Sequence, residues 1–254
     1  MLTRPPAGIF ADASPVDAHD IQTGAWVEHR SGGHLGYDMS LTSKICRCTW
    51  LATLLVAGQG PLPALADRTW DFQVFLDQKE IGSHRFDLRD RESQRELVSQ
   101  ARMTVKLLFV TAYTYEHRDV ERWDGDCLST LSSTTDDNGG KYRVEVQRRD
   151  GATVVQTLEG SQRLDECVLT FAYWNPAMLR QTQLLNSQDG EYVKVKITDA
   201  GADSIVVRGV RTPARRYELR SQKLSIDLWY SEQEEWLALE STTERGQKLI
   251  YKLK

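Results

Sequence analysis

The feature that most constrains this chain is an alternation of apolar and polar residues between residue 67 and residue 254. Successive side chains of a β-strand point to opposite faces of the sheet, so a period of two predicts strands that each bury one face. The alternation is clearest in six segments, which are 70–76, 97–109, 142–146, 193–197, 224–230 and 249–253.

Short polar turns separate these segments. Gly, Asn and Asp recur in them and tolerate the positive φ of tight hairpins, as in 136–140, 150–151, 189–190 and 199–201. Such short links make neighbouring strands antiparallel. We therefore expect an all-β fold, an antiparallel up-and-down meander that forms a barrel or a curled half-barrel.

One segment does not follow the strand pattern. Asn175 is a good helix cap, Pro176 suits the first helical position, and Asn186 is a good stop. We expect one short helix around residues 174–186. A single helix that interrupts a long meander would cover or plug one side of the curved sheet.

An export signal occupies residues 39–66. Lys44 and Arg47 are followed by the short apolar run 48–57 and then by Ala64-Leu65-Ala66. This three-part pattern predicts a signal peptide that is cleaved near Ala66, and hence a periplasmic or secreted protein. The apolar run is too short to span a bilayer, which needs about 20 apolar residues.

The signal divides the chain into three parts. Residues 1–38 precede it, and we interpret them as a mistaken start or, alternatively, as a disordered extension. Residues 67–254 form the mature product, which we expect to be a single β domain. Cys46 and Cys48 precede the apolar run, so neither can become a lipidated first residue, and we expect no stable membrane anchor.

Two cysteines, Cys127 and Cys167, follow the signal. A pair of cysteines in an oxidising compartment predicts a disulfide, with two separate buried thiols as the alternative. The two cysteines and two histidines of this region have no compact spacing, so we expect no metal site and no cofactor. The net charge of −4 and the scattered basic residues argue against nucleic-acid binding.

Catalytic motifs do not stand out in the mature region. His84 and His117 could act as bases, but neither lies in a recognisable motif, and His84 shares a strand face with Phe86. We interpret both as ordinary strand histidines. The acidic stretches 124–126 and 136–138 lack the spacing of a calcium loop and are interpreted as turns.

Three stretches of the mature chain carry a family resemblance. They are FQVFLDQKEIGSHRFDL (72–88), FAYWNPAMLRQTQLLNSQDG (171–190) and LWYSEQEEWLALESTTERGQKLIYKL (228–253). Together they resemble an uncharacterised family of exported bacterial proteins, classed as a domain of unknown function. The resemblance implies a β-barrel-like fold. More distantly, the layout is similar to the half-barrels of lipoprotein carriers, a likeness of fold alone.

These observations support three functional hypotheses. The first is a periplasmic protein that binds or carries a lipid-like or other apolar ligand, with Trp123, Tyr173, Trp174 and Met178 lining the site. The second is a structural or interaction module of the cell envelope without a ligand. The third is an enzyme whose site is assembled across strands, which would require His84 or His117 to face a cleft beside Asp or Glu. The sequence favours a non-enzymatic protein and leaves the ligand and the oligomeric state open.

Overall fold

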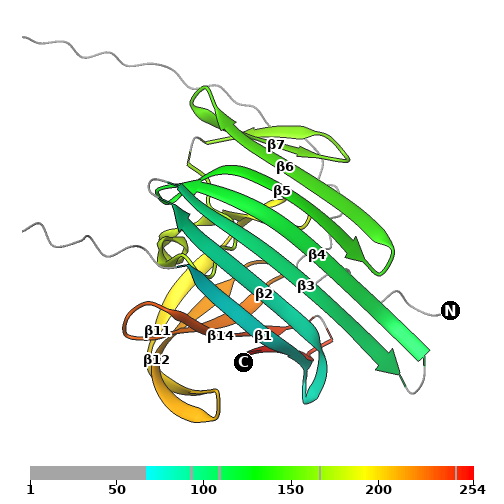
Figure 1. The fold of residues 1–254 in the computed structure, drawn as a ribbon, viewed down its shortest axis with the longest axis vertical. Coiled ribbons are helices and arrows are strands. Elements are labelled where there is room, and N and C mark those ends of the chain that lie inside the picture. The colour runs from blue at the N-terminus through cyan, green and yellow to red at the C-terminus, as the bar shows by residue number, and fades with distance from the viewer. Residues whose placement is uncertain (1–66, 92–93, 108–109, 166, 244) are drawn as a thin grey trace, which may run out of the picture. The chain divides into compact units, whose positions relative to one another are not determined.

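The computed structural model describes residues 67–254, apart from residues 92–93, 108–109, 166 and 244. The predictions for residues 1–38 and for the signal peptide 39–66 lie outside the described residues. Thirteen of the described strands form one antiparallel sheet in meander order (Figure 1). The fold class predicted from the alternation is thus confirmed.

The first half of this sheet is built from eight consecutive strands. Each pairs with the next along the chain. They are β1 (Arg68–Leu76), β2 (Lys79–Arg91), β3 (Gln94–Leu107), β4 (Val110–Asp124), β5 (Cys127–Asp137), β6 (Gly140–Arg149), β7 (Ala152–Thr157) and β8 (Ser161–Leu164).

The second half consists of five strands from the C-terminal part of the chain. They are β11 (Lys196–Val207), β12 (Val210–Arg220), β13 (Ser225–Tyr230), β14 (Trp236–Thr242) and β15 (Lys248–Leu253). The last strand, β15, pairs with β1, so the two halves form one continuous sheet. The order runs from β11 to β15 and then from β1 to β8, which leaves β11 and β8 as the two edges of an unclosed sheet.

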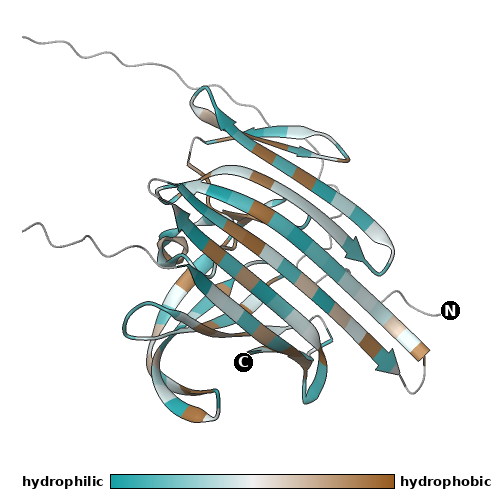
Figure 2. Ribbon diagram, viewed as in Figure 1, coloured by the Kyte–Doolittle hydropathy of each residue, from teal (hydrophilic) through white to brown (hydrophobic). Residues whose placement is uncertain are grey.

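The hairpin turns follow the local sequence. Asp77, Asn138 and Asp150 adopt φ values of 56°, 50° and 52° at the β1–β2, β5–β6 and β6–β7 turns. Asn and Asp tolerate this left-handed conformation better than most residues do. The alternation also sets which face is buried, and Figure 2 shows apolar and polar bands alternating along the strands.

The connection from β8 to β11 is the part of the fold that positions the site. We call residues 167–195 the crossing segment; it contains the 3₁₀ helix η1 (Pro176–Arg180) and the short strands β9 (Gln183–Leu185) and β10 (Tyr192–Lys194). It contacts both halves of the sheet, because the Leu128 N–H donates to the Val168 carbonyl and the Tyr230 hydroxyl donates to the Tyr173 carbonyl. The segment therefore fills the inner side of the curled sheet.

The helix expected over residues 174–186 is much shorter in the structure. Asn175 caps it as predicted, since its side chain accepts a hydrogen bond from the Ala177 N–H, but the helix ends at Arg180. Residues 183–185 form a strand instead, because Leu184 pairs with Val193 and both Leu184 and Leu185 are fully buried. The predicted strand 193–197 is likewise divided between β10 and β11.

Two anchors hold the crossing segment in place. The predicted disulfide between Cys127 and Cys167 is present, with a Cα–Cα distance of 4.9 Å, and it joins β5 to the start of the segment. Near the other end, Gly190 has φ of 84°, and a Cβ there would lie 2.6 Å from Cγ2 of Thr157. Only glycine allows so close an approach to β7 with this backbone.

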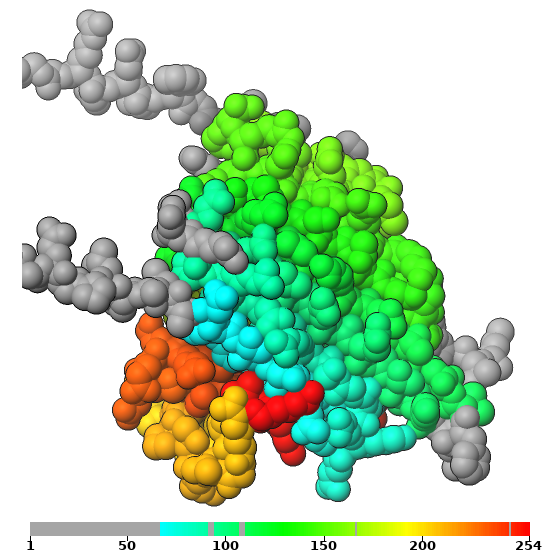
Figure 3. Space-filling model, viewed as in Figure 1, coloured from blue at the N-terminus to red at the C-terminus, as the bar shows by residue number. Residues whose placement is uncertain are grey.

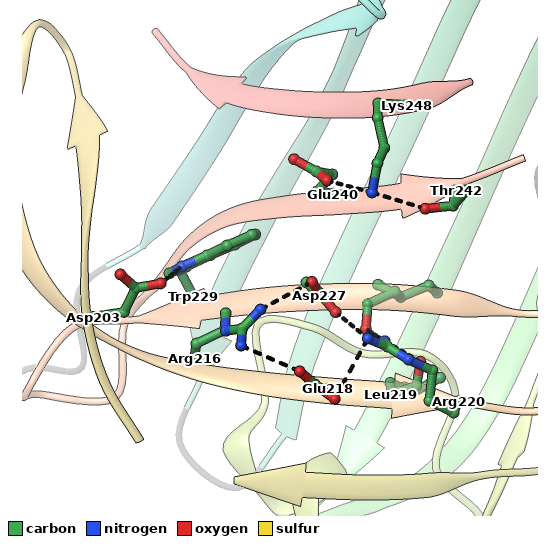
Figure 4. A network of polar contacts seen from close by, with 11 residues as sticks. Asp203, Arg216, Glu218, Leu219, Arg220, Asp227, Trp229, Glu240, Thr242 and Lys248 are labelled. Atoms are coloured by element: carbon green, nitrogen blue, oxygen red, sulfur yellow. Dashed lines mark hydrogen bonds and ion pairs between the residues drawn. The ribbon is translucent and has the colours of Figure 1, made fainter. Parts of the chain in front are cut away.

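Ion pairs join the outer side chains of the C-terminal strands. Arg220 on β12 contacts Asp227 on β13 at 2.6 Å, and Arg216 contacts Asp227 at 3.4 Å (Figure 4). On β13, Trp229 Nε1 donates to Asp203 of the edge strand β11 at 2.9 Å. These pairs are partly exposed and stabilise the sheet only modestly.

Loss of the disulfide should destabilise the domain without changing its fold. The bond closes a loop with a sequence separation of 40 residues, for which the chain-entropy model gives about 4 kcal/mol. We expect the double variant C127S/C167S to show that loss in urea unfolding, and the wild-type protein to match it after reduction. An unchanged unfolding midpoint in the double variant would contradict the anchoring role.

Candidate functional site

The inner face of β4 carries an unusual run of ionisable residues. His117, Asp119 and Glu121 occupy alternate positions and are 6%, 4% and 2% exposed. They share this face with the buried Tyr115 and Trp123. Three such groups on one buried strand face are uncommon, because charged side chains are rarely buried unless they are paired.

Neighbouring strands extend this polar region sideways. In the sheet register, His117 lies between Ala101 on β3 and Thr135 on β5. Asp119 lies in the same way between Ser99 and Ser133. The inner face of the sheet is therefore polar at its centre, and aromatic and aliphatic residues flank it.

A small cavity of ≈ 50 Å³ separates this polar region from the crossing segment. β2, β3 and β4 form one wall, and residues 170–174 and 186–188 form the other. The lining residues are His84, Phe86, Leu97, Ser99, His117, Asp119, Glu121, Thr170, Phe171, Ala172, Tyr173, Trp174, Asn186, Ser187 and Gln188.

Hydrogen bonding limits where the protons around His117 can lie. The Thr135 hydroxyl donates to the Gln188 carbonyl at 3.1 Å, so it must accept from His117 Nδ1, which lies 2.9 Å away. His117 Nε2 lies 3.1 Å from Asp119 Oδ2, and that contact also requires a proton. The proton sits on one atom or the other, and the pair has no net charge in either case.

The other two ionisable groups of the cavity are also neutral near pH 7. Burial, together with the neighbouring Asp119, raises the pKa of Glu121 to about 8. Burial and the nearby His117 lower the pKa of His84 well below its ordinary value. Because His117 and Asp119 have no net charge as a pair, these four residues give the cavity a polar lining without net charge.

Several buried polar atoms of the lining have no hydrogen-bond partner among the described residues. Among them are Asp119 Oδ1, the Tyr173 hydroxyl and Trp174 Nε1. Buried polar atoms in native proteins are nearly always hydrogen-bonded, and each exception needs an explanation. One carboxyl acceptor, one N–H donor and one hydroxyl thus occur together in the lining of a single cavity.

His84 forms a second polar contact on the same wall of the cavity, where Ala101 of β3 lies between it and His117. Its Nε2 lies 2.9 Å from Ser99 Oγ, and its Nδ1 lies 3.3 Å from the Tyr251 hydroxyl. The imidazole ring stacks on Phe86, with the ring centroids 4.0 Å apart. The ring is thereby held in one orientation, with each nitrogen beside a hydroxyl group.

The four residues expected to line an apolar site lie in two different places. Tyr173 and Trp174 line the cavity. Trp123 packs edge to face against Trp174 at 5.4 Å and is fully buried behind it, and Met178 is also fully buried. Neither Trp123 nor Met178 belongs to the cavity lining.

Sequence reasoning missed Asp119, Glu121 and Ser99 and interpreted both histidines as ordinary. The sequence did contain an indication of this burial. His117, Asp119 and Glu121 alternate along the strand in step with Tyr115 and Trp123, so all five point to the same face. Two aromatic residues on one strand face predict that the residues between them are also buried. The acidic stretches 124–126 and 136–138 lie at hairpin ends, as interpreted.

The described part of the chain has neither a cluster of metal ligands nor a membrane-spanning helix. No group of three His, Cys, Asp or Glu residues there is arranged to hold a metal ion. No helix among those residues has the length and apolar character needed to cross a membrane.

Similarity to known proteins agrees with this architecture. The fold is similar to that of a β-barrel-like protein of domain of unknown function DUF1849 from Brucella abortus, with a TM-score of 0.56 and 8% identity over 75% of this chain and 96% of that one. At this identity the likeness concerns the fold alone. The model of the domain of unknown function DUF6134 matches residues 72–254, so the chain belongs to that family. No curated protein matches the sequence.

Neutralising Glu121 permanently should change how stability depends on pH. Because its pKa is raised from 4.5 to about 8 in the folded protein, the unfolded chain releases this proton first as the pH rises, and stability falls between those values. We expect E121Q to remove that fall, worth about 5 kcal/mol. Urea unfolding from pH 4 to pH 9 measures it, with the exposed Glu116→Gln on the same strand as control. Parallel pH profiles for wild type and E121Q would contradict the assignment.

Proposed function

We propose that this protein binds, without converting it, a small uncharged polar molecule, or the polar end group of a larger one, in the cavity beneath the crossing segment. The observation that carries the proposal is the set of unpartnered polar atoms on Asp119, Tyr173 and Trp174. A ligand with a hydroxyl or amide group could donate to Asp119 Oδ1 and accept from Trp174 Nε1. Such a ligand would offset the desolvation of both groups.

The electrostatics of the lining support an uncharged ligand. The His117–Asp119 pair has no net charge, and Glu121 is mostly protonated at neutral pH because its pKa is about 8. A charged ligand would lose its hydration without gaining a counter-charge, which is strongly unfavourable in a buried site. A hydroxyl or carboxamide group avoids that loss.

The size of the cavity bears on the lipid-like ligand expected from the sequence. Pockets for drug-sized ligands span roughly 300–1,000 Å³, whereas this cavity has ≈ 50 Å³. An acyl chain on the inner side of the sheet would have to displace residues of the crossing segment such as Tyr173 and Trp174. The cavity therefore supports a polar group better than an apolar chain, and lipid carriage stays a prediction.

Export from the cytoplasm is part of the same proposal. The Cys127–Cys167 disulfide supports it, because structural disulfides persist mainly in oxidising compartments such as the periplasm. The compartment would also decide which molecules reach the cavity.

The ligand proposal predicts opposite effects of one substitution on stability and on binding. Tyr173→Phe removes a buried hydroxyl that has no partner, so the free protein should be about 1 kcal/mol more stable. Native mass spectrometry of protein purified without denaturation should show a bound mass that is lost in Y173F and W174F. Trp229→Phe, which changes an outer indole bonded to Asp203, is the matched control.

If wild-type protein carries no bound mass and gains no thermal stability from small amides or polyols, the ligand proposal fails. A filled envelope module without a ligand would then be the better description.

A second candidate function is acyl transfer, favoured by the 2.9 Å contact between Ser99 Oγ and His84 Nε2. A neutral imidazole in this position could accept the serine proton while Oγ attacks an electrophile. With a fluorophosphonate probe, Ser99 Oγ would bond to phosphorus, fluoride would leave and the proton would pass to His84. We expect labelling of wild type and of the control S133A, but not of S99A or H84Q. No labelling of wild type would exclude this candidate.

A further inference from the structure

The outer face of the first six strands carries a second, larger depression. It is a groove of ≈ 800 Å³ whose lining residues come from β1 to β6, with Leu158 and Lys254 also contributing. The face turned to the viewer in Figure 3 is covered by these strands, coloured cyan to green. The groove shares only His117 with the lining of the inner cavity, and it includes no residue of the crossing segment.

Arginines recur along this groove at every second strand. In the sheet register, Arg85 on β2, Arg118 on β4 and Arg143 on β6 lie in one cross-strand row, separated by Gln100 on β3 and Thr134 on β5. All five residues line the groove. Neighbouring strands lie about 4.8 Å apart, so successive arginine positions in the row are separated by about 10 Å.

The charges of the groove favour an anion, although the whole chain has a net charge of −4. Its lining contains six basic side chains and three acidic ones. The basic residues are Arg85, Arg102, Arg118, Lys141, Arg143 and Lys254, and the acidic residues are Asp71, Glu116 and Asp136.

The side chain of Arg118, at the centre of the row, makes no ion pair or hydrogen bond within the described part of the chain. Arg85 and Arg143 contact Asp87 and Glu145 on their own strands, at 2.8 and 3.1 Å. These are exposed pairs of the kind that contributes little to stability and can be exchanged for a ligand's anionic group. The row thus offers the unpaired guanidinium of Arg118, flanked by two guanidiniums whose present carboxylate partners a ligand could replace.

We propose that this groove binds an extended acidic polysaccharide, with its carboxylates on the arginine row and its hydroxyl groups on Gln100, Thr134 and Ser83. Guanidinium groups form strong charge-assisted hydrogen bonds to carboxylates. The neutral polar residues between the arginines match the hydroxyl groups between the charged positions of a glycan.

Two other polyanions fit the groove less well. A nucleic-acid strand carries one phosphate per 3.4 Å or so of helix axis, which is much denser than the arginine row. A lipid would bring acyl chains to a surface where Leu158 is the large exposed apolar side chain of the described lining.

The test is fluorescence anisotropy with labelled hyaluronan fragments, which carry a carboxylate on every second sugar, and with neutral dextran as the uncharged probe. We expect the intact protein to bind hyaluronan in a salt-sensitive manner and not to bind dextran. R118Q should weaken binding about tenfold or more and reduce the salt dependence. Arg89→Gln is the matched control, since Arg89 is exposed on β2 but does not line the groove.

Three outcomes would overturn the proposal. The first is equal loss of hyaluronan binding in R118Q and R89Q, which would indicate general charge attraction. The second is capture by phosphatidylglycerol vesicles without hyaluronan binding, which would indicate a lipid surface. The third is no binding by the wild-type protein. Arg118 is exposed, so thermal unfolding of R118Q should match wild type and exclude misfolding as the cause.

Discussion

The structure depends on how an unclosed, curled sheet covers its inner face. A closed barrel satisfies its edges and fills its interior with side chains from its own strands. Here β8 and β11 do not pair, and the chain between them lies across the inner side. The Leu128–Val168 hydrogen bond, the Cys127–Cys167 disulfide and the close approach at Gly190 hold it there. Large buried residues such as Trp123 and Trp236 pack around this segment.

This arrangement explains why polar residues can occupy the middle of the core. The crossing segment brings backbone carbonyls, which a layer of packed side chains alone would not supply. Ser133 donates to the Ser187 carbonyl and Thr135 donates to the Gln188 carbonyl, which in turn orients His117. Three residues with unpaired buried atoms, Asp119, Tyr173 and Trp174, line one cavity, and for that reason we assign a ligand there. Other unpaired atoms, those of Trp70, Asn175 and Asp189, are on residues outside that lining. The outer groove has a different origin, since its arginines follow from sheet register alone.

Much of the fold could be predicted from the sequence because strand alternation and turn residues are local signals. The meander, the turns at Asn138 and Asp150 and the cap at Asn175 all follow from short stretches. The Cys127–Cys167 bond follows from the pairing of the two cysteines that remain after the signal. The pairing of β15 with β1 and the strand at Leu184–Leu185 depend on distant partners, which local patterns do not report. The inner cluster was missed for a related reason. His117, Asp119 and Glu121 each look ordinary on a polar strand. They are buried because the crossing segment covers the face of the sheet to which they point.

The central claim is that the crossing segment is a fixed part of the core and leaves only a small polar cavity. Native-state hydrogen exchange tests it most directly through the Leu128 amide, which is bonded to the Val168 carbonyl, and the Leu185 amide, which is bonded to the Leu169 carbonyl. We predict that both exchange only through global unfolding, within about 1 kcal/mol of the amides in the central strand β1. Exchange of both at a free energy several kcal/mol lower would show that the segment opens as a lid, and would contradict the account.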